Sequence, residues 1–419
     1  MPNTTGKNGH QNGICPPDEK LRVLLHDYAL RDLSLDQRLE YLAAEGYSIR
    51  HTTLKALNKK FGVPTVKKPP PLPVAITIVS SVVMRDLAAR NGPTTIQGTI
   101  RRTNQILIPR DTVRTIMRHN FPHGAEIRFP GKKIVRPRGH IQIGDGVHQE
   151  VHCDGHEKYN KKGLRMGNVG MDIYGMRCHS SGRILYDIVV PNARCSSTIG
   201  HVYLDFVEKY GEICEKLTVN GGSETGEMYA CHKALRDKYM PNLDPDLSPA
   251  FVAIPSTANV MIEGSWNHWL RFCGTTVRMS IEEGKTNGYF LPHDEIHVNL
   301  FLWLWPKILQ LALNEFVDWW NNHKTRYQKR SNLPSGTTPN FIYDFPQNFG
   351  LKHCGVKISR EDIDALRLTI PRSREECFQW VSTEFDMAAS AAYVQCGSPQ
   401  LDHTVGWKIF IDMVKILKA

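Results

Sequence analysis

Three short segments contain the residues of this chain whose types could support chemistry. Asp154 ends an apolar strand, Asn220 follows a short strand and precedes two glycines, and Glu263 lies in the first turns of a helix. Carboxylate oxygens are the ligands that hard divalent cations prefer. Taken alone, however, Asp154 would cap a turn and Glu263 would face solvent. Their order along the chain and the residues around them favour a functional site instead.

The flanking residues resemble the DDE signature shared by retroviral-type integrases and transposases. Within that group the chain is most similar to transposon-derived integrase-core proteins of fungi and animals. The matching residues are His152, Asp154, Gly155 and Lys158 in the first motif, Thr218, Gly222 and Glu224 in the second, and Asn259, Glu263 and Trp266 in the third. Asn321, Asn322, His323 and Arg326, followed by Pro334, Ser335 and Gly336, fit as well. The resemblance covers residues 18–345.

The resemblance implies a metal-dependent DNA strand transfer. In that family three carboxylates bind two Mg²⁺ or Mn²⁺ ions, one for the attacking oxygen and one for the leaving oxygen. Asp154 would bridge both ions, position 220 would bind one, and Glu263 would bind the other. The cofactor expected from the resemblance is therefore Mg²⁺ or Mn²⁺, if the core is active.

The chain departs from this pattern at the second acid. Position 220 is Asn220, whose neutral amide is a weaker ligand than a carboxylate, and Met261 stands where the family has a basic residue. Both departures favour an inactive or slowed core. Glu224 is a candidate substitute ligand, although family members often carry a glutamate there anyway. The alternative to an impaired integrase is a non-enzymatic DNA-binding protein, a degenerate or domesticated transposase that acts by occupying its site.

Histidines near the first motif suggest a second kind of metal site. His148, His152, Cys153 and His156 are close in sequence. Strand alternation places positions 148, 152, 154 and 156 on one side, and no second ligand pair lies at zinc-finger spacing. The pattern therefore disfavours zinc, and His152 is better explained as a neighbour of the metal-binding carboxylate.

The positive charge of the chain is concentrated in its first third. Residues 1–140 contain 23 Lys and Arg against 10 Asp and Glu, whereas residues 141–419 contain 29 against 32. Such a basic segment suits the phosphate backbone of double-stranded DNA, because neutralising phosphates releases counterions. A solvated basic surface without a ligand would give the same count. The expected DNA-binding residues are Arg50, Lys55, Lys59, Lys60, Arg110, Arg114, Arg118, Lys132, Lys133, Arg136 and Arg138.

Two helical modules are predicted to present these cations. In the first, helices starting near Asp18 and Ser34 precede Gly46 and a third helix over residues 51–61, the pattern of a helix-turn-helix. In the second, a helix ending at Asn91-Gly92-Pro93 precedes helices over 95–104 and 109–119. Three-helix units also serve as plain packing modules.

From Val147 the pattern changes to alternating strands and helices. Strands are expected at 148–153, 168–178, 183–190, 216–219 and 250–254, and helices at 197–210, 225–238 and 257–272. Three antiparallel strands followed by helix, strand, helix, strand and helix is the order of an RNase H-like core. Beyond it, an apolar helical region over 296–321 is expected to divide at Pro306. Its four tryptophans indicate a buried core or a dimer face, and disfavour a stacking role on nucleic acid.

The predicted fold class is α/β, with an RNase H-like core built on a mixed five-stranded sheet. All-α helix-turn-helix modules precede the core and a helical C-terminal region follows it. The expected boundaries are a disordered tail (1–17), two helix-turn-helix modules (18–65 and 74–130), a basic linker (131–146), the core (147–275), its helical extension (276–345) and a C-terminal region of unknown role (346–419). A Pro-rich linker over 66–73 is expected between the modules.

The composition of the chain indicates the cellular compartment in which the protein acts. The ten scattered cysteines include no CxxC pair and indicate reduced thiols, and the polar N-terminus indicates that the chain is not secreted. No uninterrupted apolar stretch is long enough to predict a membrane span. We therefore expect a nuclear protein, cytoplasmic before import, that forms a homo-oligomer on DNA. The apolar stretch over 405–417 would either complete the core or pair subunits.

Overall fold

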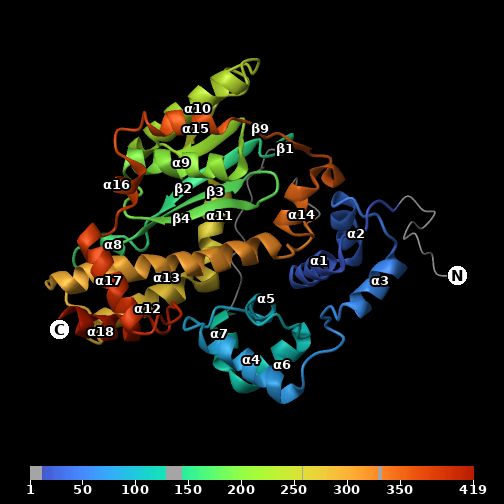
Figure 1. Ribbon diagram of the computed structural model, residues 1–419, viewed down its shortest axis with the longest axis horizontal. Helices are drawn as coiled ribbons and strands as arrows, with labels where there is room; N and C mark the ends of the chain where they lie inside the picture. The colour runs from blue at the N-terminus through green and yellow to red at the C-terminus, as the bar shows by residue number, and fades with distance from the viewer. Residues whose placement is uncertain (1–11, 129–143, 257, 329–332) are drawn as a thin grey trace. The chain divides into compact units, whose positions relative to one another are not determined.

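The computed structural model describes residues 12–128, 144–256, 258–328 and 333–419 (Figure 1). The chain forms two compact units, residues 1–133 and 134–419. The first is all helical, and the second is built around a mixed sheet with helices. The α/β class and the mixed five-stranded sheet predicted from the sequence are thereby confirmed.

The first unit begins with three helices around a small apolar core. They are α1 (Asp18–Leu30), α2 (Leu35–Ala44) and α3 (His51–Lys60). Leu25, Leu42 and Leu54, one from each helix, are fully buried together. Ser34 caps α2, since its side chain accepts from the backbone N–H of Gln37 while the Gln37 side chain accepts from that of Ser34. The predicted helix starts in this module are close to those observed.

A second group of helices follows: α4 (Leu72–Met84), α5 (Pro93–Thr103), α6 (Arg110–Asn120) and α7 (His123–Arg128). The prediction for α4 was wrong at both ends. The helix begins inside the expected Pro-rich linker, because a proline such as Pro73 is tolerated in the first helical turn. It ends at Met84 rather than near Asn91, since the Asp86 carboxylate accepts from the Asn91 backbone N–H and closes a turn.

The N-terminal tail is ordered where it is described. The prediction of disorder over residues 1–17 is wrong for residues 12–17. Gly13 forms an antiparallel bridge with Tyr47, and the Ser48 N–H donates to the Asn12 carbonyl over 2.9 Å. Backbone pairing holds this segment, although its one large apolar side chain, Ile14, is exposed. Residues 1–11 lie outside the described part of the chain.

The second unit is organised by a five-stranded sheet in the order β4-β3-β2-β6-β7. Its strands are β2 (Glu150–His156), β3 (Asp172–Cys178), β4 (Ile184–Val190), β6 (Lys216–Asn220) and β7 (Phe251–Ile254). β2, β3 and β4 pair antiparallel, whereas β6 runs parallel to β2 and β7 parallel to β6. The carboxyl ends of β2 and β6 therefore meet at one edge of the sheet.

Helices cover both faces of this sheet (Figure 1). One face packs on α9 (Ser196–Tyr210) and α10 (Gly226–Tyr239), with Val151 and Cys153 pointing into that core. The other face packs on α11 (Val260–Trp269) and α13 (Glu295–Asn322). Because successive strand residues point to opposite faces, His152, Asp154 and His156 lie on the α11 side.

α13 is a single helix, so the predicted division at Pro306 was wrong. A proline removes one backbone donor, and the surrounding apolar contacts keep the helix continuous. Length and composition alone would let α13 cross a bilayer. Its tryptophans are all buried: Trp303, Trp305, Trp319 and Trp320. The expectation of a buried aromatic core is confirmed.

The C-terminal region packs onto the second unit. It contains α14 (Pro339–Asp344), α15 (Arg360–Arg367), α16 (Arg374–Phe378), α17 (Thr383–Gln395) and α18 (Gly406–Leu417). Trp407 of α18 packs in a tilted arrangement against Trp305 of α13, with ring centroids 5.0 Å apart. Arg374 binds the Asp205 carboxylate of α9 through two nitrogens. Two pairs of short strands also join the C-terminal region to the rest of the second unit. β8 (Lys352–His353) pairs with β1 (Gly146–Val147), and β9 (Val356–Lys357) pairs with β5 (Glu212–Ile213). The apolar stretch over 405–417 thus completes the core.

A π-helical turn, Leu270–Gly274, joins α11 to α12 (Thr275–Thr286). The Tyr159 hydroxyl, which is fully buried, donates to the Gly274 carbonyl over 2.6 Å. The wider turn places Trp269 before it and Val277 after it in the same apolar core.

Gly175 allows α11 to approach the sheet closely. It pairs with Asp154 across β2 and β3, and a Cβ at this position would lie 2.6 Å from Cη2 of Trp266. Gly264, on α11 itself, has only ordinary contacts, since its Cβ would lie 3.8 Å from the Arg177 guanidinium.

These two glycines give a matched pair of substitutions. Gly175→Ala should lower the free energy of unfolding by about 1–3 kcal/mol, because it overpacks the Trp266 contact. Gly264→Ala should raise it by roughly 0.5–1 kcal/mol through helix propensity. Chemical denaturation of both variants measures these differences. Equal effects of the two substitutions would contradict the close packing at Gly175.

Candidate functional site

Asp154 is the centre of a buried polar network at the carboxyl edge of β2. Its side chain is 8% exposed. Oδ1 accepts a hydrogen bond from the Asn220 amide over 2.5 Å, and Oδ2 accepts one from the Trp266 indole N–H over 3.0 Å. Both carboxylate oxygens are therefore held by neutral donors, one from the end of β6 and one from α11.

Asn259 extends this network to His152. It precedes α11 and is fully buried. Its amide nitrogen donates to the Asn220 side-chain oxygen over 3.3 Å, and its own side-chain oxygen lies 2.7 Å from Nδ1 of His152. The first and third predicted motifs thus meet through Asn259, while Thr257, two residues earlier, lies outside the described residues.

Glu263 and Glu224 act on Asp154 through their charge. Burial raises the pKa of Asp154 to about 7, the Trp266 hydrogen bond opposes this shift, and the Glu263 and Glu224 carboxylates add to it. Glu263 lies in the first turn of α11, and Glu224 lies in the short 3₁₀ turn Ser223–Thr225 that follows β6. The fold therefore brings three acidic side chains and Asn220 to one edge of the sheet.

This arrangement fits a two-metal centre poorly. A bridging ion needs the Asp154 lone pairs that now accept hydrogen bonds, and Asn220 turns its N–H toward Asp154 rather than its oxygen. Asn220 is also neutral, so this edge carries one negative charge fewer than it would with an aspartate at position 220. The carboxylates of Asp154, Glu263 and Glu224 do not converge on one point either, because among the described residues the group whose ligand atoms lie within 4.8 Å of one another is Glu150, His152 and His179.

The zinc set considered from the sequence is not assembled. His148 precedes β2 with a positive φ of 58°, so it falls out of the strand alternation, and its ring packs on Phe206 instead. Cys153 faces the opposite core from His152. His156 stacks on Trp266 with ring centroids 5.0 Å apart.

Sequence reasoning missed two residues beside His152. His179, in the turn after β3, places Nδ1 2.9 Å from Nε2 of His152, and Glu150 places Oε1 3.4 Å from the same nitrogen. Glu150 was detectable, because it lies two positions from His152 on the same strand face. His179 was not, since its approach depends on the register of β2 against β3. The Trp266 bond to Asp154 was likewise invisible in the sequence.

The predicted DNA-binding cations of the first unit lie on two helices. Arg50, Lys55, Lys59 and Lys60 are exposed at the start and along α3. Arg110 and Arg118 of α6 are exposed and Arg114 is half-buried, opposite the buried Val113 and Met117. Lys132, Lys133, Arg136 and Arg138 lie outside the described residues.

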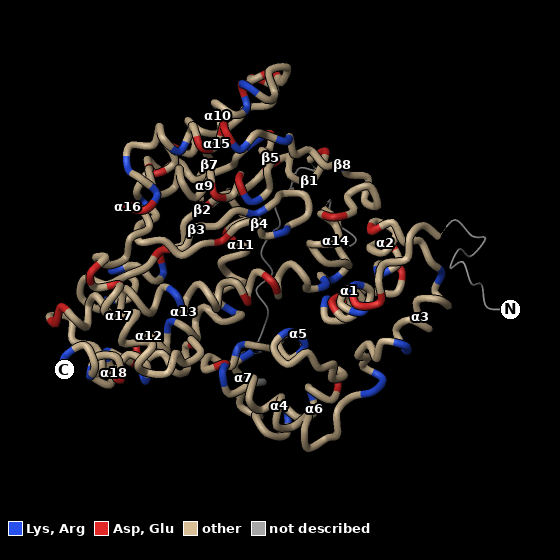
Figure 2. The backbone as a smooth tube through the Cα atoms, viewed as in Figure 1, with Lys and Arg blue, Asp and Glu red and all other residues tan. Residues whose placement is uncertain are grey.

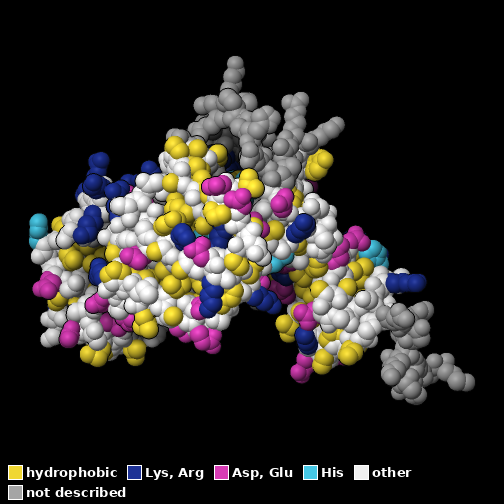
Figure 3. All heavy atoms as spheres, turned by 90° about the horizontal axis from the view of Figure 1, so that it is seen from above, with side chains coloured by type: hydrophobic (Ala, Val, Ile, Leu, Met, Phe, Trp, Pro, Cys, Tyr) yellow, Lys and Arg dark blue, Asp and Glu magenta, His cyan; other side chains and the backbone are white. Residues whose placement is uncertain are grey.

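Acidic residues accompany these cations within the first unit and throughout the second. Figure 2 shows acidic residues on α1 and α2 and basic residues on α3. On the face of the molecule seen in Figure 3, acidic and basic side chains are interspersed. Residues 141–419 are nearly balanced in charge, with 29 Lys and Arg against 32 Asp and Glu.

Comparison with models of known protein families and with curated proteins gives no match for this chain.

The raised pKa of Asp154 predicts a pH-dependent stability. A carboxyl whose pKa is higher in the folded than in the unfolded state favours folding at low pH, and this contribution is lost as pH rises from about 4 to about 7. Over this pH window the free energy of unfolding of the wild-type chain should fall by about 3–4 kcal/mol more than that of Asp154→Asn, since one pKa unit is worth about 1.4 kcal/mol. Denaturant unfolding in the presence of a chelator measures the difference. Parallel pH profiles would contradict this environment for Asp154.

Proposed function

We propose that the chain is a DNA-binding protein with a recombinase-type core, whose ancestral metal-dependent strand transfer is impaired by Asn220. The observation that carries this proposal is the meeting of Asp154, Asn220 and Glu263 at one edge of the sheet. Asp154 lies inside β2 near its carboxyl end, Asn220 is the last residue of β6, and Glu263 lies in the first turn of α11, in the order that the DDE resemblance predicts.

The arrangement of the sheet supports the same ancestry. Three antiparallel strands (β2, β3, β4) are followed by α9, β6, α10, β7 and α11, which is the chain order expected of an RNase H-like core. Mixed sheets of this size occur in many proteins, so the fold alone carries no function. The acidic edge is what links it to phosphodiester chemistry.

A specific contact favours the second candidate, a non-enzymatic protein that acts by occupying DNA. The Asn220 amide supplies the hydrogen bond at Asp154 Oδ1 without any cation, so the buried carboxylate is satisfied in the metal-free protein. An aspartate at position 220 would instead place a second carboxylate against Asp154 and would need a cation to offset their repulsion. In this candidate the core is a scaffold and the N-terminal helices bind DNA.

Asn220→Asp tests whether the missing acid is the defect. Without metal, the new carboxylate would contact Asp154, and the free energy of unfolding at pH 7 should fall by about 3 kcal/mol because a buried charge lacks a partner. Mn²⁺ should restore the stability of this variant and change that of wild type much less. Cleavage or joining of a labelled duplex with Mn²⁺ should rise by at least about tenfold, which is 1.4 kcal/mol in the barrier.

Asn220→Ala is the matched control, because it removes the amide donor without adding an acid. It should stay inactive and gain no Mn²⁺-dependent stability. If Asn220→Asp binds Mn²⁺ but remains inactive, the non-enzymatic candidate is supported. If Mn²⁺ stabilises neither variant, the assignment of this edge as a former metal centre is wrong.

The proposal also predicts how the full chain binds duplex DNA. The double substitution Lys55→Ala with Lys59→Ala removes two exposed cations on one face of α3. It should weaken binding and reduce the slope of log affinity against log salt by about 2, if each lysine neutralises one phosphate.

The control removes two exposed lysines from the other unit, Lys352→Ala with Lys357→Ala. It changes the net charge equally and should leave the salt dependence unchanged. Fluorescence anisotropy at several salt concentrations measures both variants. Equal losses would indicate an effect of net charge and would refute a role for α3 as the DNA-binding element.

A further inference from the structure

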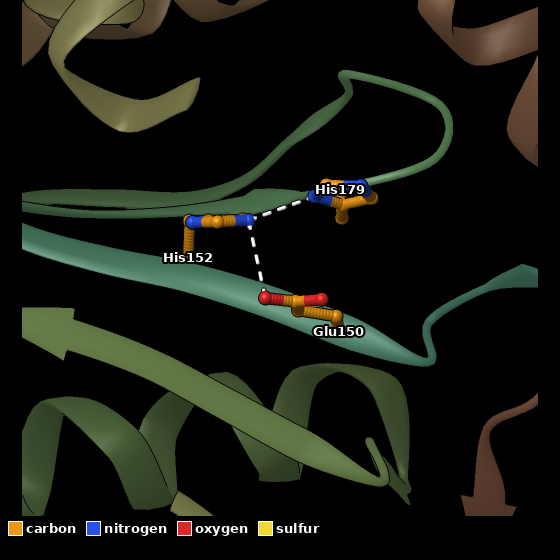
Figure 4. A group of neighbouring side chains, drawn as sticks. All are labelled: Glu150, His152 and His179. Carbon is orange, nitrogen blue, oxygen red and sulfur yellow. Dashed lines mark hydrogen bonds and ion pairs between the residues drawn. The ribbon is translucent and has the colours of Figure 1, made fainter. Parts of the chain in front are cut away.

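Glu150, His152 and His179 form a second polar cluster, which we name the His–Glu cluster (Figure 4). Glu150 and His152 are two residues apart on β2 and share one face of the strand. His179 comes from the turn after β3, and its backbone N–H donates to the Glu150 carbonyl over 3.0 Å. The pairing of Val151 with Cys178 fixes this register, so the sheet itself brings the three side chains together.

The ligand atoms of the cluster converge on one point. Nε2 of His152 lies 2.9 Å from Nδ1 of His179 and 3.4 Å from Oε1 of Glu150, and all three atoms lie within 4.8 Å of one another. A tetrahedral ion with bonds of about 2.0–2.1 Å holds its ligand atoms roughly 3.3 Å apart. The observed separations need to change by little to accept such an ion.

Neighbouring residues orient the imidazole of His152. The Asn259 side-chain oxygen, 2.7 Å from Nδ1, can only accept a hydrogen bond, so Nδ1 carries the proton. The lone pair of Nε2 then faces His179 and Glu150. Metal-bound histidines typically donate their second N–H to an oxygen in this way.

Neighbouring residues also orient the carboxylate of Glu150. The Thr218 hydroxyl donates to Oε1 over 2.5 Å, and the Lys216 ammonium lies 2.8 Å from Oε2. Oε1 keeps a second lone pair that points toward the two histidines. His152 and His179 are 5% and 7% exposed and the Glu150 side chain is 17% exposed, so all three groups are largely shielded from water.

We propose that the His–Glu cluster binds one divalent transition-metal ion of the Zn²⁺ class. Two imidazoles and one carboxylate are ligands that suit such an ion, and three protein ligands leave a fourth position for water. Because His179 lies in the turn after β3 while Glu150 and His152 lie on β2, the ion would hold that turn against β2. The site is separate from the acidic edge, which offers carboxylate oxygens and no imidazole, and the proposal does not depend on strand transfer by the core.

Metal content of the full-length chain tests this inference. After removal of metal by a chelator and addition of Zn²⁺, the wild-type protein should retain about one ion more per chain than His179→Ala or Glu150→Gln. Loss of one ligand should weaken binding more than about 100-fold, the upper end for loss of an outer partner. Zn²⁺ should raise the melting temperature of wild type and much less that of either variant.

Two controls separate this site from its neighbours. His353→Ala removes a histidine from another His–Glu pair, with His353 Nε2 2.6 Å from Glu212 Oε2, and should leave the metal content unchanged. Asp154→Asn alters the acidic edge and should also retain the ion. If Asp154→Asn loses the ion while His179→Ala keeps it, the metal belongs to the acidic edge and the His–Glu cluster is refuted.

Cobalt substitution distinguishes these ligands from the ten cysteines. Co²⁺ in the His–Glu cluster should give the visible bands of nitrogen and oxygen ligation without a thiolate charge-transfer band, and His179→Ala should remove them. A thiolate band, or equal metal content in wild type, His179→Ala and Glu150→Gln, would overturn the proposal. Glu150→Gln and the wild-type spectrum keep the test decisive if His179→Ala fails to fold.

Discussion

The carboxylate of Asp154 is buried between the sheet and α11, and its two hydrogen bonds hold these elements in register. The Asn220 donor comes from β6 and the Trp266 donor from α11, so one side chain joins three elements. A buried carboxylate without such donors would cost several kcal/mol. Asn259 then links Asn220 to His152, and the network continues to the His–Glu cluster.

An amide at position 220 changes the electrostatic character of this edge. With Asn220, each polar atom between Asp154 and His152 finds a partner within the chain itself. An acid at that position would have to share the space with Asp154, whose pKa burial and the nearby glutamates already raise. The amide therefore favours a stable metal-free core at the expense of cation binding. Under the proposed ancestry, this amide would preserve the geometry of the edge while it weakened metal-dependent chemistry there.

Much of this framework could be predicted from the sequence. Alternating apolar residues indicated the strands, and the DDE resemblance predicted that Asp154 and Asn220 would share a site, where a hydrogen bond now joins them. Features set by tertiary contacts could not be predicted. The Trp266 bond requires the gap at Gly175, and His179 reaches Glu150 only through strand register. The continuity of α13 across Pro306 and the docking of α18 likewise depend on packing against partners distant in sequence.

The π-helical turn at Leu270–Gly274 has a consequence for how this region tolerates change. An α-helix advances about 100° per residue, and a π turn advances less per residue because it holds more residues per turn. The wider turn therefore absorbs one extra residue without changing the rotational phase of α12, whose Val277 and Ile281 face the core. An insertion elsewhere in α11 or α12 would have no such compensation and would rotate both side chains away from that core. The junction between the two helices thus accommodates a length that a regular helix would not.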